Sequence, residues 1–400
     1  AATAVDPRLP AGLQRILLVF VALALVFARR PDVFALPQFW AEDGAVFFAE
    51  HHRLGWAAVL QPYAGYLHLW PRVTAGLAAP FPVAWAPLLY LASAIIALGL
   101  AVLRTASPRS GLRESVACAL SIVLVPHAAE LILNVTNAQW YGAIVLAVTA
   151  VAHAPFSRLG RGVDAALVGV FGLTGPFGVL LLPAFAWRVF AQRDRHSWLL
   201  LIMVAATAAV QVFTVLVADS KAGVDATPQV WLQLLGAVGW RTGGELTGLT
   251  SLIDIRAVPW VGVGLLALWG ALCLVPATGL HERSRVMLLI AAGAVVLGGM
   301  LLFRGYPGEL FLSATTQRYF ALPVLVSLWL LVAGARWGGG ARWRRITCVL
   351  TLIVAGAHAW HGFRVAPLVA FDWAAGARAI EAGQAVSVPI NPAPWAVVLE

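Results

Sequence analysis

The run LLVFVALALVFARRP, from Leu17 to Pro31, decides the class of this fold. It belongs to an apolar stretch over residues 13–28, close to the roughly 20 residues that a helix needs to cross a bilayer. The run lacks the alternation of apolar and polar residues that marks a barrel strand, so it predicts a membrane-spanning helix. Because Arg29 and Arg30 follow it instead of small residues, we interpret it as a retained anchor helix and not as a removed secretory signal.

The whole chain has the composition of a membrane protein. Of its 400 residues, 61% are hydrophobic and 11% are charged, whereas soluble proteins carry about 25% charged residues. The formal net charge of +9 comes from short basic clusters between apolar runs, which is typical of a topology signal and not of a nucleic-acid site. We therefore expect an all-α polytopic membrane protein in a lipid bilayer, with no nucleic-acid partner.

Apolar runs of suitable length predict about 11 transmembrane passes. Residues 163–190 are too many for a single span and are interrupted by Gly175 and Pro176, which predicts two half-spans that meet at a bend. The predicted full spans are residues 13–28, 83–103, 115–133, 138–154, 197–218, 258–277, 286–303, 318–335 and 345–361.

The basic residues predict the topology of these spans. With the N-terminus in the cytoplasm, short inner segments hold 16 of the 27 basic residues, as the positive-inside rule requires. The long outer segments are then residues 29–82, 219–257, 304–317 and 362–400. The inner residues are Arg8, Arg15, Arg104, Arg109, Arg113, Arg158, Arg161, Arg188, Arg193, Arg195, Arg283, Arg285, Arg336, Arg342, Arg344 and Arg345.

The predicted organisation is one membrane domain, residues 1–361 with the outer loop 29–82, followed by an outer C-terminal segment, residues 362–400. At roughly forty residues this segment is too short for a core of its own, so we expect it to pack as a lid on the outer surface. Lys221 is the only lysine beside many arginines, which suggests a bacterial source. We therefore expect the bacterial cytoplasmic (inner) membrane, with the polar machinery and the C-terminus outside.

Several common sites are missing from the sequence. Cys118, Cys273 and Cys348 lie in apolar runs without the spacing of a metal site or a disulfide framework. The chain also has no P-loop, no HExxH motif and no GxSxG motif, which argues against ATP-driven, zinc-dependent and serine-hydrolase functions. The pair His51 and His52 offers a weaker metal hypothesis, because adjacent side chains on a helix point in different directions.

The first outer loop is rich in ionisable residues, although the rest of the chain is mostly apolar. Among them are Glu42 and Asp43, which Gly44 follows. Carboxylates at a membrane surface can take a proton from a hydroxyl nucleophile, especially when partial burial raises their pKa. We expect Gly44 to permit a tight backbone turn beside them. The simpler alternative is that both carboxylates are solvated loop charges.

Further polar residues follow in two groups. Tyr63, Tyr66, His68 and Arg72 form a Tyr-x-Gly-Tyr-x-His-x-x-x-Arg pattern that is apolar enough to lie at the interface. A second group pairs a carboxylate and amides with an aromatic ring, as sugar sites do, although an interfacial turn explains it equally well. This second group lies within residues 127–141 and includes Glu130, Asn134, Asn137, Gln139 and Trp140.

Cations on the outer side could hold a phosphate, because the planar fork of arginine pairs with phosphate oxygens. Among the candidate phosphate ligands we rank Arg72 and Arg318 first. The alternative role for each is a snorkelling anchor at the end of a span. The other candidates are Lys221, Arg241 and Arg304.

An acidic Glu-Asp-Gly motif in the first outer loop, a multi-span body and a small outer C-terminal region resemble the GT-C superfamily of integral-membrane glycosyltransferases. The resemblance implies a polyprenyl-phosphate sugar as donor, inversion at the sugar, and Asp43 as the catalytic base, with Glu42 as the alternative. The chain lacks the Trp-Trp-Asp and Asp-Leu-x-Val-Tyr motifs of well-known branches, so the resemblance leaves the sugar and the acceptor open.

The sequence therefore predicts a glycosyltransferase that acts on a hydroxyl of a cell-envelope glycan or glycolipid at the outer face of the membrane. A transporter or flippase of a lipid-linked saccharide is the alternative, and it would need the same lipid-phosphate site but no base. A scaffold without activity ranks third. No cofactor follows from the sequence; a divalent cation near Glu42 and Asp43 stays open, but the ligand spacing gives it no support.

Overall fold

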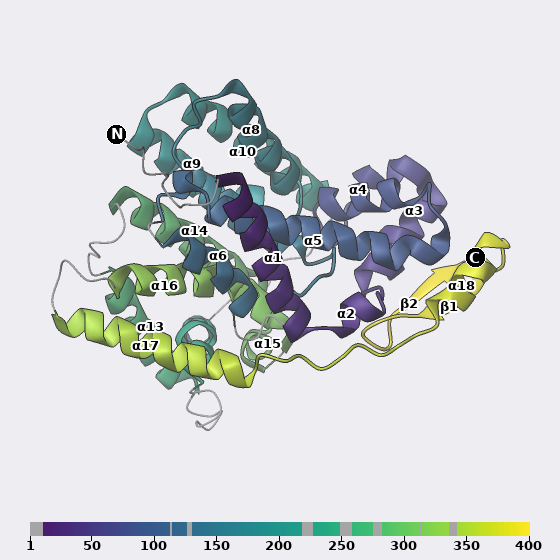
Figure 1. Cartoon of the computed structure of the whole chain (residues 1–400). Coiled ribbons are helices and arrows are strands. Elements are labelled where there is room, and N and C mark those ends of the chain that lie inside the picture. The colour runs from purple at the N-terminus through teal and green to yellow at the C-terminus, as the bar shows by residue number, and fades with distance from the viewer. Residues whose placement is uncertain are drawn as a thin grey trace, which may run out of the picture.

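The computed structural model describes residues 11–112, 114–125, 130–217, 227–248, 258–274, 282–312, 314–335 and 342–400. Helices dominate these residues, and the two strands found among them form one antiparallel hairpin near the C-terminus (Figure 1). The elements are α1 (Ala11–Arg29), α2 (Asp32–Ala35), α3 (Ala49–Leu54), α4 (Leu69–Ala78), α5 (Ala86–Thr105), α6 (Ser115–Leu124), α7 (Ala138–Val151), α8 (Arg158–Gly172), α9 (Phe177–Gln192), α10 (Arg195–Val217), α11 (Pro228–Gly239), α12 (Glu245–Thr247), α13 (Val258–Leu274), α14 (Glu282–Leu302), α15 (Pro307–Leu312), α16 (Ala321–Gly334), α17 (Arg342–His361), α18 (Trp373–Glu381), β1 (Val386–Pro389) and β2 (Ala396–Leu399).

A helix lies at each of the predicted spans, and in the described residues five helices are long and apolar enough to cross a membrane. The chain is therefore a mostly helical protein suited to a bilayer, while the number of passes stays a prediction. The five are Gly12–Arg29, Val83–Thr105, Arg195–Val217, Arg283–Leu302 and Thr316–Gly334.

The predicted span over residues 115–133 is wrong at its C-terminal end. The helix α6 ends at Leu124, and Val125 adopts ψ 125°, outside the helical region. Pro126 follows in the sequence, and a proline disfavours the helical conformation of the residue before it. Residues 130–137 consequently form turns that connect α6 to α7.

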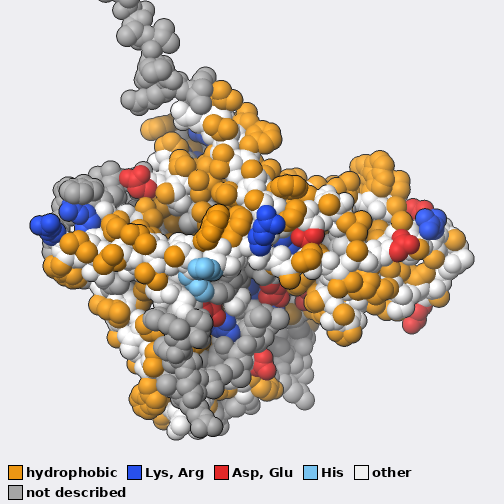
Figure 2. All heavy atoms as spheres, turned by 60° about the horizontal axis from the view of Figure 1, so that its bottom comes forward, with side chains coloured by type: hydrophobic (Ala, Val, Ile, Leu, Met, Phe, Trp, Pro, Cys, Tyr) orange, Lys and Arg blue, Asp and Glu red, His pale blue; other side chains and the backbone are white. Residues whose placement is uncertain are grey.

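The helix α7 is the centre of the bundle, since every one of its side chains is buried. It packs against α5, α8 and α9. The surrounding helices turn apolar side chains outward; Phe20, Ile202 and Phe213 are each more than 60% exposed. Figure 2 shows hydrophobic side chains over most of the described surface on one face. Such an exterior fits lipid, where apolar side chains need no covering.

The sequence 173–178 forms the predicted bend between α8 and α9, with Gly175 at φ 81°. Residues 67–70 lie against it; they belong to the segment 29–82, which keeps the name first outer loop from the topology prediction. Gly175 N donates to Leu67 O at 2.9 Å, and Leu69 N donates to Leu173 O at 3.0 Å. The two irregular segments therefore satisfy each other's backbone groups, as backbone in an apolar surrounding must.

The C-terminal segment and the first outer loop form one lobe, at the right of Figure 1. Phe39 and Phe47 of the loop share a buried cluster with Trp373 of α18 and Val397 of β2. Gly44 lies inside a π-helix, Asp43–Phe48, and not at the predicted turn. A Cβ on Gly44 would come within 2.8 Å of Val397, so the glycine is needed for close packing against the hairpin.

The segment 219–257, predicted to lie outside the membrane, contains a helix that was not predicted from the sequence. This helix, α11, packs closely on α13, because Gly236 and Gly239 face Gly262 at backbone distance. A Cβ on Gly239 would overlap the carbonyl of Gly262. Small residues at a helix interface are a common way to pack helices in a membrane.

Candidate functional site

Asp43 joins two loops that are far apart in the sequence. Its Oδ1 accepts hydrogen bonds from Thr136 N at 2.7 Å and Thr136 Oγ1 at 2.6 Å, and its Oδ2 accepts one from Val135 N at 3.1 Å. Only 2% of Asp43 is exposed. Burial raises the pKa of its carboxyl to about 7, although the three hydrogen bonds favour the charged form. In this conformation Asp43 holds the first outer loop on the turns before α7.

Glu42, the neighbouring carboxylate, is half-buried and faces a different group of residues. Tyr63 Oη donates to Glu42 Oε1 at 3.2 Å. Burial raises the pKa of Tyr63 to about 12, and the nearby charge of Glu42 adds to this rise. The phenol therefore stays protonated at neutral pH and orients the Glu42 carboxylate.

The Tyr63–Tyr66 segment is a tight turn. The two residues exchange backbone hydrogen bonds, and both Ala64 (φ 52°) and Gly65 (φ 89°) have the left-handed backbone that such a turn needs. The turn brings both tyrosine rings onto His68, at 5.8 and 4.9 Å between centroids. Burial, helped by the charge of Arg72, lowers the pKa of His68 to about 3. His68 is therefore a neutral packing residue at physiological pH.

Arg72 was predicted to bind phosphate, but in the structure its guanidinium contacts other residues of the protein. Its Nη1 lies 2.6 Å from Glu50 Oε2, and its Nη2 donates to Gln61 O at 3.1 Å. The guanidinium also lies over the ring of Phe47, and only 1% of Arg72 is exposed. To reach the buried guanidinium of Arg72, a phosphate would have to displace the partly exposed Glu50.

Arg318, the other cation ranked first, is partly accessible. Its Nη1 pairs with Glu130 Oε1 at 2.9 Å, and the two side chains are 23% and 16% exposed. Burial raises the pKa of Glu130 to about 7; the charge of Arg318 opposes this rise and that of Glu42 adds to it. Three segments distant in the sequence thus converge here. We name this group the Arg318 cluster; its members are Glu42, Tyr63, Tyr66, Glu130, Arg318 and Tyr319.

The predicted sugar-binding amides build the loop instead of facing an open site. The side chains of Asn134 and Asn137 both donate to Glu130 O, at 2.6 and 3.0 Å. Asn137 is fully buried, and Gln139 donates to Thr136 O at 3.5 Å. These bonds fix the turns that carry Glu130. An amide in this role cannot be told from a ligand-binding amide by sequence alone.

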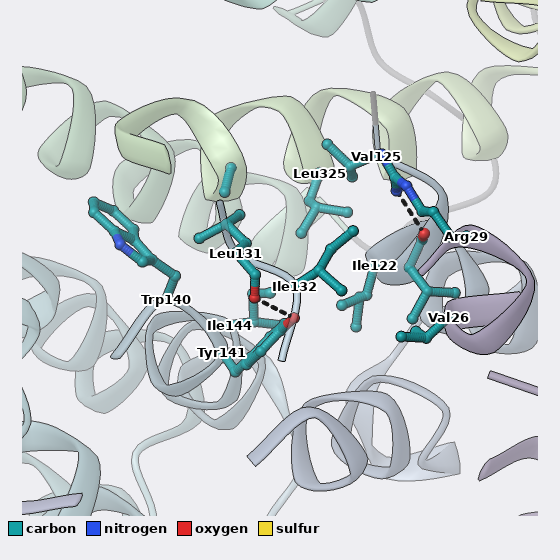
Figure 3. Close-up of a pocket in the computed structure, with 12 residues that line it drawn as sticks. Val26, Arg29, Ile122, Val125, Leu131, Ile132, Trp140, Tyr141, Ile144 and Leu325 are labelled. Atoms are coloured by element: carbon teal, nitrogen blue, oxygen red, sulfur yellow. Dashed lines mark hydrogen bonds between the residues drawn. The ribbon is translucent and has the colours of Figure 1, made fainter. Parts of the chain in front are cut away.

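Trp140 packs against Tyr319, a member of the Arg318 cluster. Its ring meets Tyr319 edge-on at 5.1 Å and Phe177 at 4.9 Å, and only 5% of it is exposed. A cavity of about 20 Å³ lies between Trp140 and Arg29, at opposite ends in Figure 3. That volume suits a water molecule and not a sugar. The structure therefore gives no support to Trp140 as an exposed platform for a sugar.

The remaining predicted cations lie elsewhere. Arg241 is buried, pairs with Glu245 and donates to Leu310 O at 2.8 Å. Arg304 donates to Leu301 O at 3.5 Å. Lys221 lies outside the described residues. Within the described part of the chain, no three His, Cys, Asp or Glu side chains come together as metal ligands would.

An apolar cavity of about 330 Å³ opens between α4, α5 and α8. Leu69 and Trp70 of α4 and Ile96 of α5 are among the residues that line it. The polar pair Thr74 and Ser93, joined by a 2.6 Å hydrogen bond, lies in its wall. The cavity is hydrophobic and borders a helix suited to span the bilayer.

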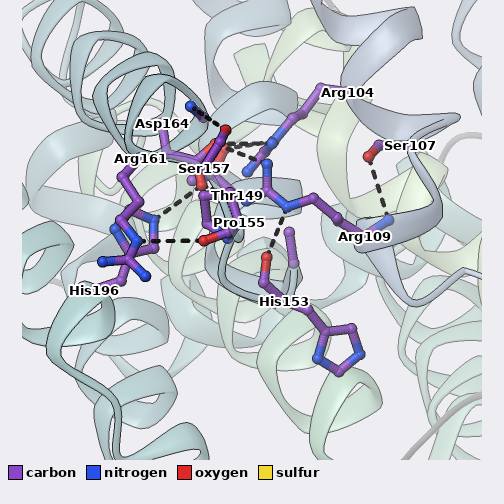
Figure 4. A network of polar contacts seen from close by, with 12 residues as sticks. Arg104, Ser107, Arg109, Thr149, His153, Pro155, Ser157, Arg161, Asp164 and His196 are labelled. Atoms are coloured by element: carbon purple, nitrogen blue, oxygen red, sulfur yellow. Dashed lines mark hydrogen bonds and ion pairs between the residues drawn. The ribbon is translucent and has the colours of Figure 1, made fainter.

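A second polar cluster lies at the other end of α7, centred on the buried carboxylate of Asp164 (Figure 4). Arg104 Nη1 and His196 Nε2 each lie 3.0 Å from an Asp164 oxygen, and Arg109 pairs with both oxygens. Arg188, fully buried, caps the end of α7 by donating to Thr149 O at 2.8 Å. The positions of these arginines in the sequence indicated a topology signal, but no local pattern revealed that Asp164 pairs with Arg104 and Arg109.

Comparisons of the chain with protein families, with curated proteins and with solved structures gave no match.

Proposed function

We propose that the chain is a membrane-bound glycosyltransferase. It takes a sugar from a polyprenyl-phosphate donor and transfers it to a hydroxyl of a cell-envelope glycan or glycolipid, on the outer face of a bacterial cytoplasmic membrane. The observation that carries this proposal is the Arg318 cluster, where a half-buried carboxylate lies near an accessible guanidinium at one end of an apolar helical bundle.

Each chemical step has a candidate residue. Glu42 accepts the proton of the acceptor hydroxyl as its oxygen attacks the anomeric carbon. The bond from that carbon to the phosphate oxygen breaks, and the phosphate leaves with the bonding electrons. Arg318 pairs with the phosphate and stabilises the growing negative charge. Attack from the face opposite the leaving group inverts the sugar configuration.

The structure favours Glu42 over Asp43 as the base. Asp43 is enclosed and both of its oxygens already accept hydrogen bonds, whereas Glu42 is half-buried and belongs to the same cluster as Arg318. Asp43 is then a positioning residue, which holds Glu42 opposite Glu130 by fixing their two loops together. Within the same proposed function, the alternative is that Asp43 is the base, as the family resemblance implies.

The test is sugar transfer by the purified protein in lipid nanodiscs, with radiolabelled polyprenyl-phosphate sugars and membrane glycan acceptors. We expect Glu42→Gln to lower the rate by roughly 10²–10⁴-fold, as the loss of a general base does, while donor binding persists. Glu309→Gln, which changes an exposed acid of α15, is the matched control and should leave the rate unchanged.

Three outcomes would be decisive against parts of this proposal. If Glu42→Gln transfers as fast as the control, Glu42 is not the base. If only Asp43→Asn loses transfer while its fold and donor binding persist, the base is Asp43. If the protein moves a lipid-linked saccharide across the bilayer without transferring sugar, the transporter alternative replaces the enzyme.

A further inference from the structure

We propose that an anionic ligand reaches Arg318 by displacing Glu130, and that Glu130 takes up a proton when this happens. The ligand class is a lipid phosphodiester, the group that links the sugar to its carrier in the donor. The inference rests on the proposed function only in assigning a phosphate to Arg318. It makes Glu130 a displaceable counter-ion that links ligand binding to protonation.

The contact between the two side chains is suited to exchange. One nitrogen of Arg318 binds one oxygen of Glu130, at 2.9 Å, so the pair is not bidentate. Both side chains keep partial exposure, unlike the fully buried guanidinium of Arg72. A phosphodiester offers two oxygens to the guanidinium fork, and bidentate pairing favours it over the single contact with Glu130.

The second oxygen of Glu130 has room for a proton. Glu130 Oε2 is buried and, among the described residues, makes no hydrogen bond. An ionised oxygen without a donor is costly in such a position. Glu42 differs, because Tyr63 already donates to it. Glu130 Oε2 has no donor in the described structure and Glu42 has one, so protonation removes a larger energetic cost from Glu130 than from Glu42.

The charges around Glu130 lead to the same conclusion. Glu42, Tyr63 and Tyr66 face the site from the first outer loop, and Arg318 and Tyr319 face it from the segment before α16. When an anion pairs with Arg318, Glu130 loses its counter-ion and lies close to two negative groups. Both changes raise its pKa further above the value of about 7 that burial already produces.

The pH dependence follows from the difference between the free and bound states. Below about pH 7 Glu130 is already protonated in the free protein, so its effect on affinity is constant. Above about pH 7 each binding event must bring a proton, and the affinity falls by up to about tenfold per pH unit. Binding should therefore weaken as the pH rises.

The experiment is isothermal titration calorimetry of the full chain in detergent with geranyl ethyl phosphate, a phosphodiester that keeps one negative charge across this pH range. Measured near pH 8.5 in two buffers of different ionisation enthalpy, the wild type should take up about one proton per ligand. The affinity should fall at least about tenfold between roughly pH 6.5 and 8.5.

Three variants test which side chain takes up the proton. Glu130→Gln should bind more tightly than wild type near pH 8.5, take up no proton and show flat affinity. Glu42→Gln is the matched control and should keep the pH dependence, whereas Arg318→Met should lose binding by at least about tenfold. Circular dichroism and size-exclusion chromatography confirm the fold of each variant.

The inference is overturned if wild type takes up no proton, if Glu130→Gln keeps the pH dependence, if Glu42→Gln removes it, or if Arg318→Met binds as well as wild type. The wild-type proton count does not depend on any variant folding. Because the experiment measures binding alone, a chain that shows linked binding but transfers no sugar would refute the proposed function and leave this inference standing.

Discussion

Thr136 donates two hydrogen bonds to one oxygen of Asp43, from its backbone nitrogen at 2.7 Å and from its hydroxyl at 2.6 Å, across 93 residues of sequence. The contact joins the first outer loop to the turns that carry Glu130. It determines how far Glu42 lies from the Glu130–Arg318 pair. The buried neighbour of Glu42 thus helps to place the residues that we propose as reactive, together with their own contacts.

Thr136→Val should destabilise the protein by about 1–3 kcal/mol, because it leaves Asp43 Oδ1 with one donor fewer in a buried place. The expected readout is a lower melting temperature in detergent. Thr136→Ser keeps the hydroxyl and is the matched control. If valine and serine melt at the same temperature, the hydroxyl does not anchor Asp43.

Gly44→Ala should loosen the C-terminal hairpin from the first outer loop. The added Cβ would lie 2.8 Å from a side-chain methyl of Val397 and 2.9 Å from one of Ile390, so these side chains must shift and the packing between the two segments weakens. We expect faster limited proteolysis after residue 362 and a loss of about 1–3 kcal/mol in stability. Gly356→Ala in α17, which meets nothing within 4 Å, should be neutral or stabilising. Equal protease resistance of both variants would show that the close approach is not required.

The helical segments could be predicted because long apolar runs carry their own signal, and Gly175 with Pro176 marked the bend between α8 and α9. The end of α6 was misplaced because composition alone extended the run beyond Pro126. Arg72 and Arg318 look alike in sequence. Their partners, Glu50 and Glu130, are contributed by tertiary contacts that no local pattern encodes.

Residue roles in the first outer loop show the same limit. The motif drew attention to Asp43, but only the fold reveals that its oxygens face residues 135 and 136 of another loop. Gly44 suggested a turn, whereas the reason for a glycine is the hairpin packed against it from the far end of the chain. Contacts between distant segments decided each of these roles.

Arg72→Met should destabilise the protein by about 3–5 kcal/mol, the usual cost of breaking a buried pair; the partial exposure of Glu50 places it toward the lower end. The double variant Arg72→Met with Glu50→Met should recover much of this loss, because no unpaired charge remains. Thermal unfolding of both variants tests the expectation.

The same variants separate a structural role of Arg72 from phosphate binding. If Arg72 only pairs with Glu50, the refolded double variant binds geranyl ethyl phosphate as wild type does. A double variant that is stable but no longer binds the phosphodiester would make Arg72 a ligand after all.

The Arg318 cluster should select a lipid with one negative charge over one with two. Glu42 faces Arg318 and stays charged when Glu130 takes up its proton, so every further anionic charge on the ligand meets repulsion from Glu42 as well as attraction to Arg318. In partly buried surroundings two like charges at about 4 Å repel by a few kcal/mol. We therefore expect a geranyl ethyl diphosphate diester to bind at least about tenfold more weakly than geranyl ethyl phosphate. Competition binding at matched ionic strength measures the ratio, and Glu42→Gln should reduce it by removing the charge that repels the ligand. Equal or tighter binding of the diphosphate by wild type would mean that Arg318 and Glu42 do not set the charge of the ligand.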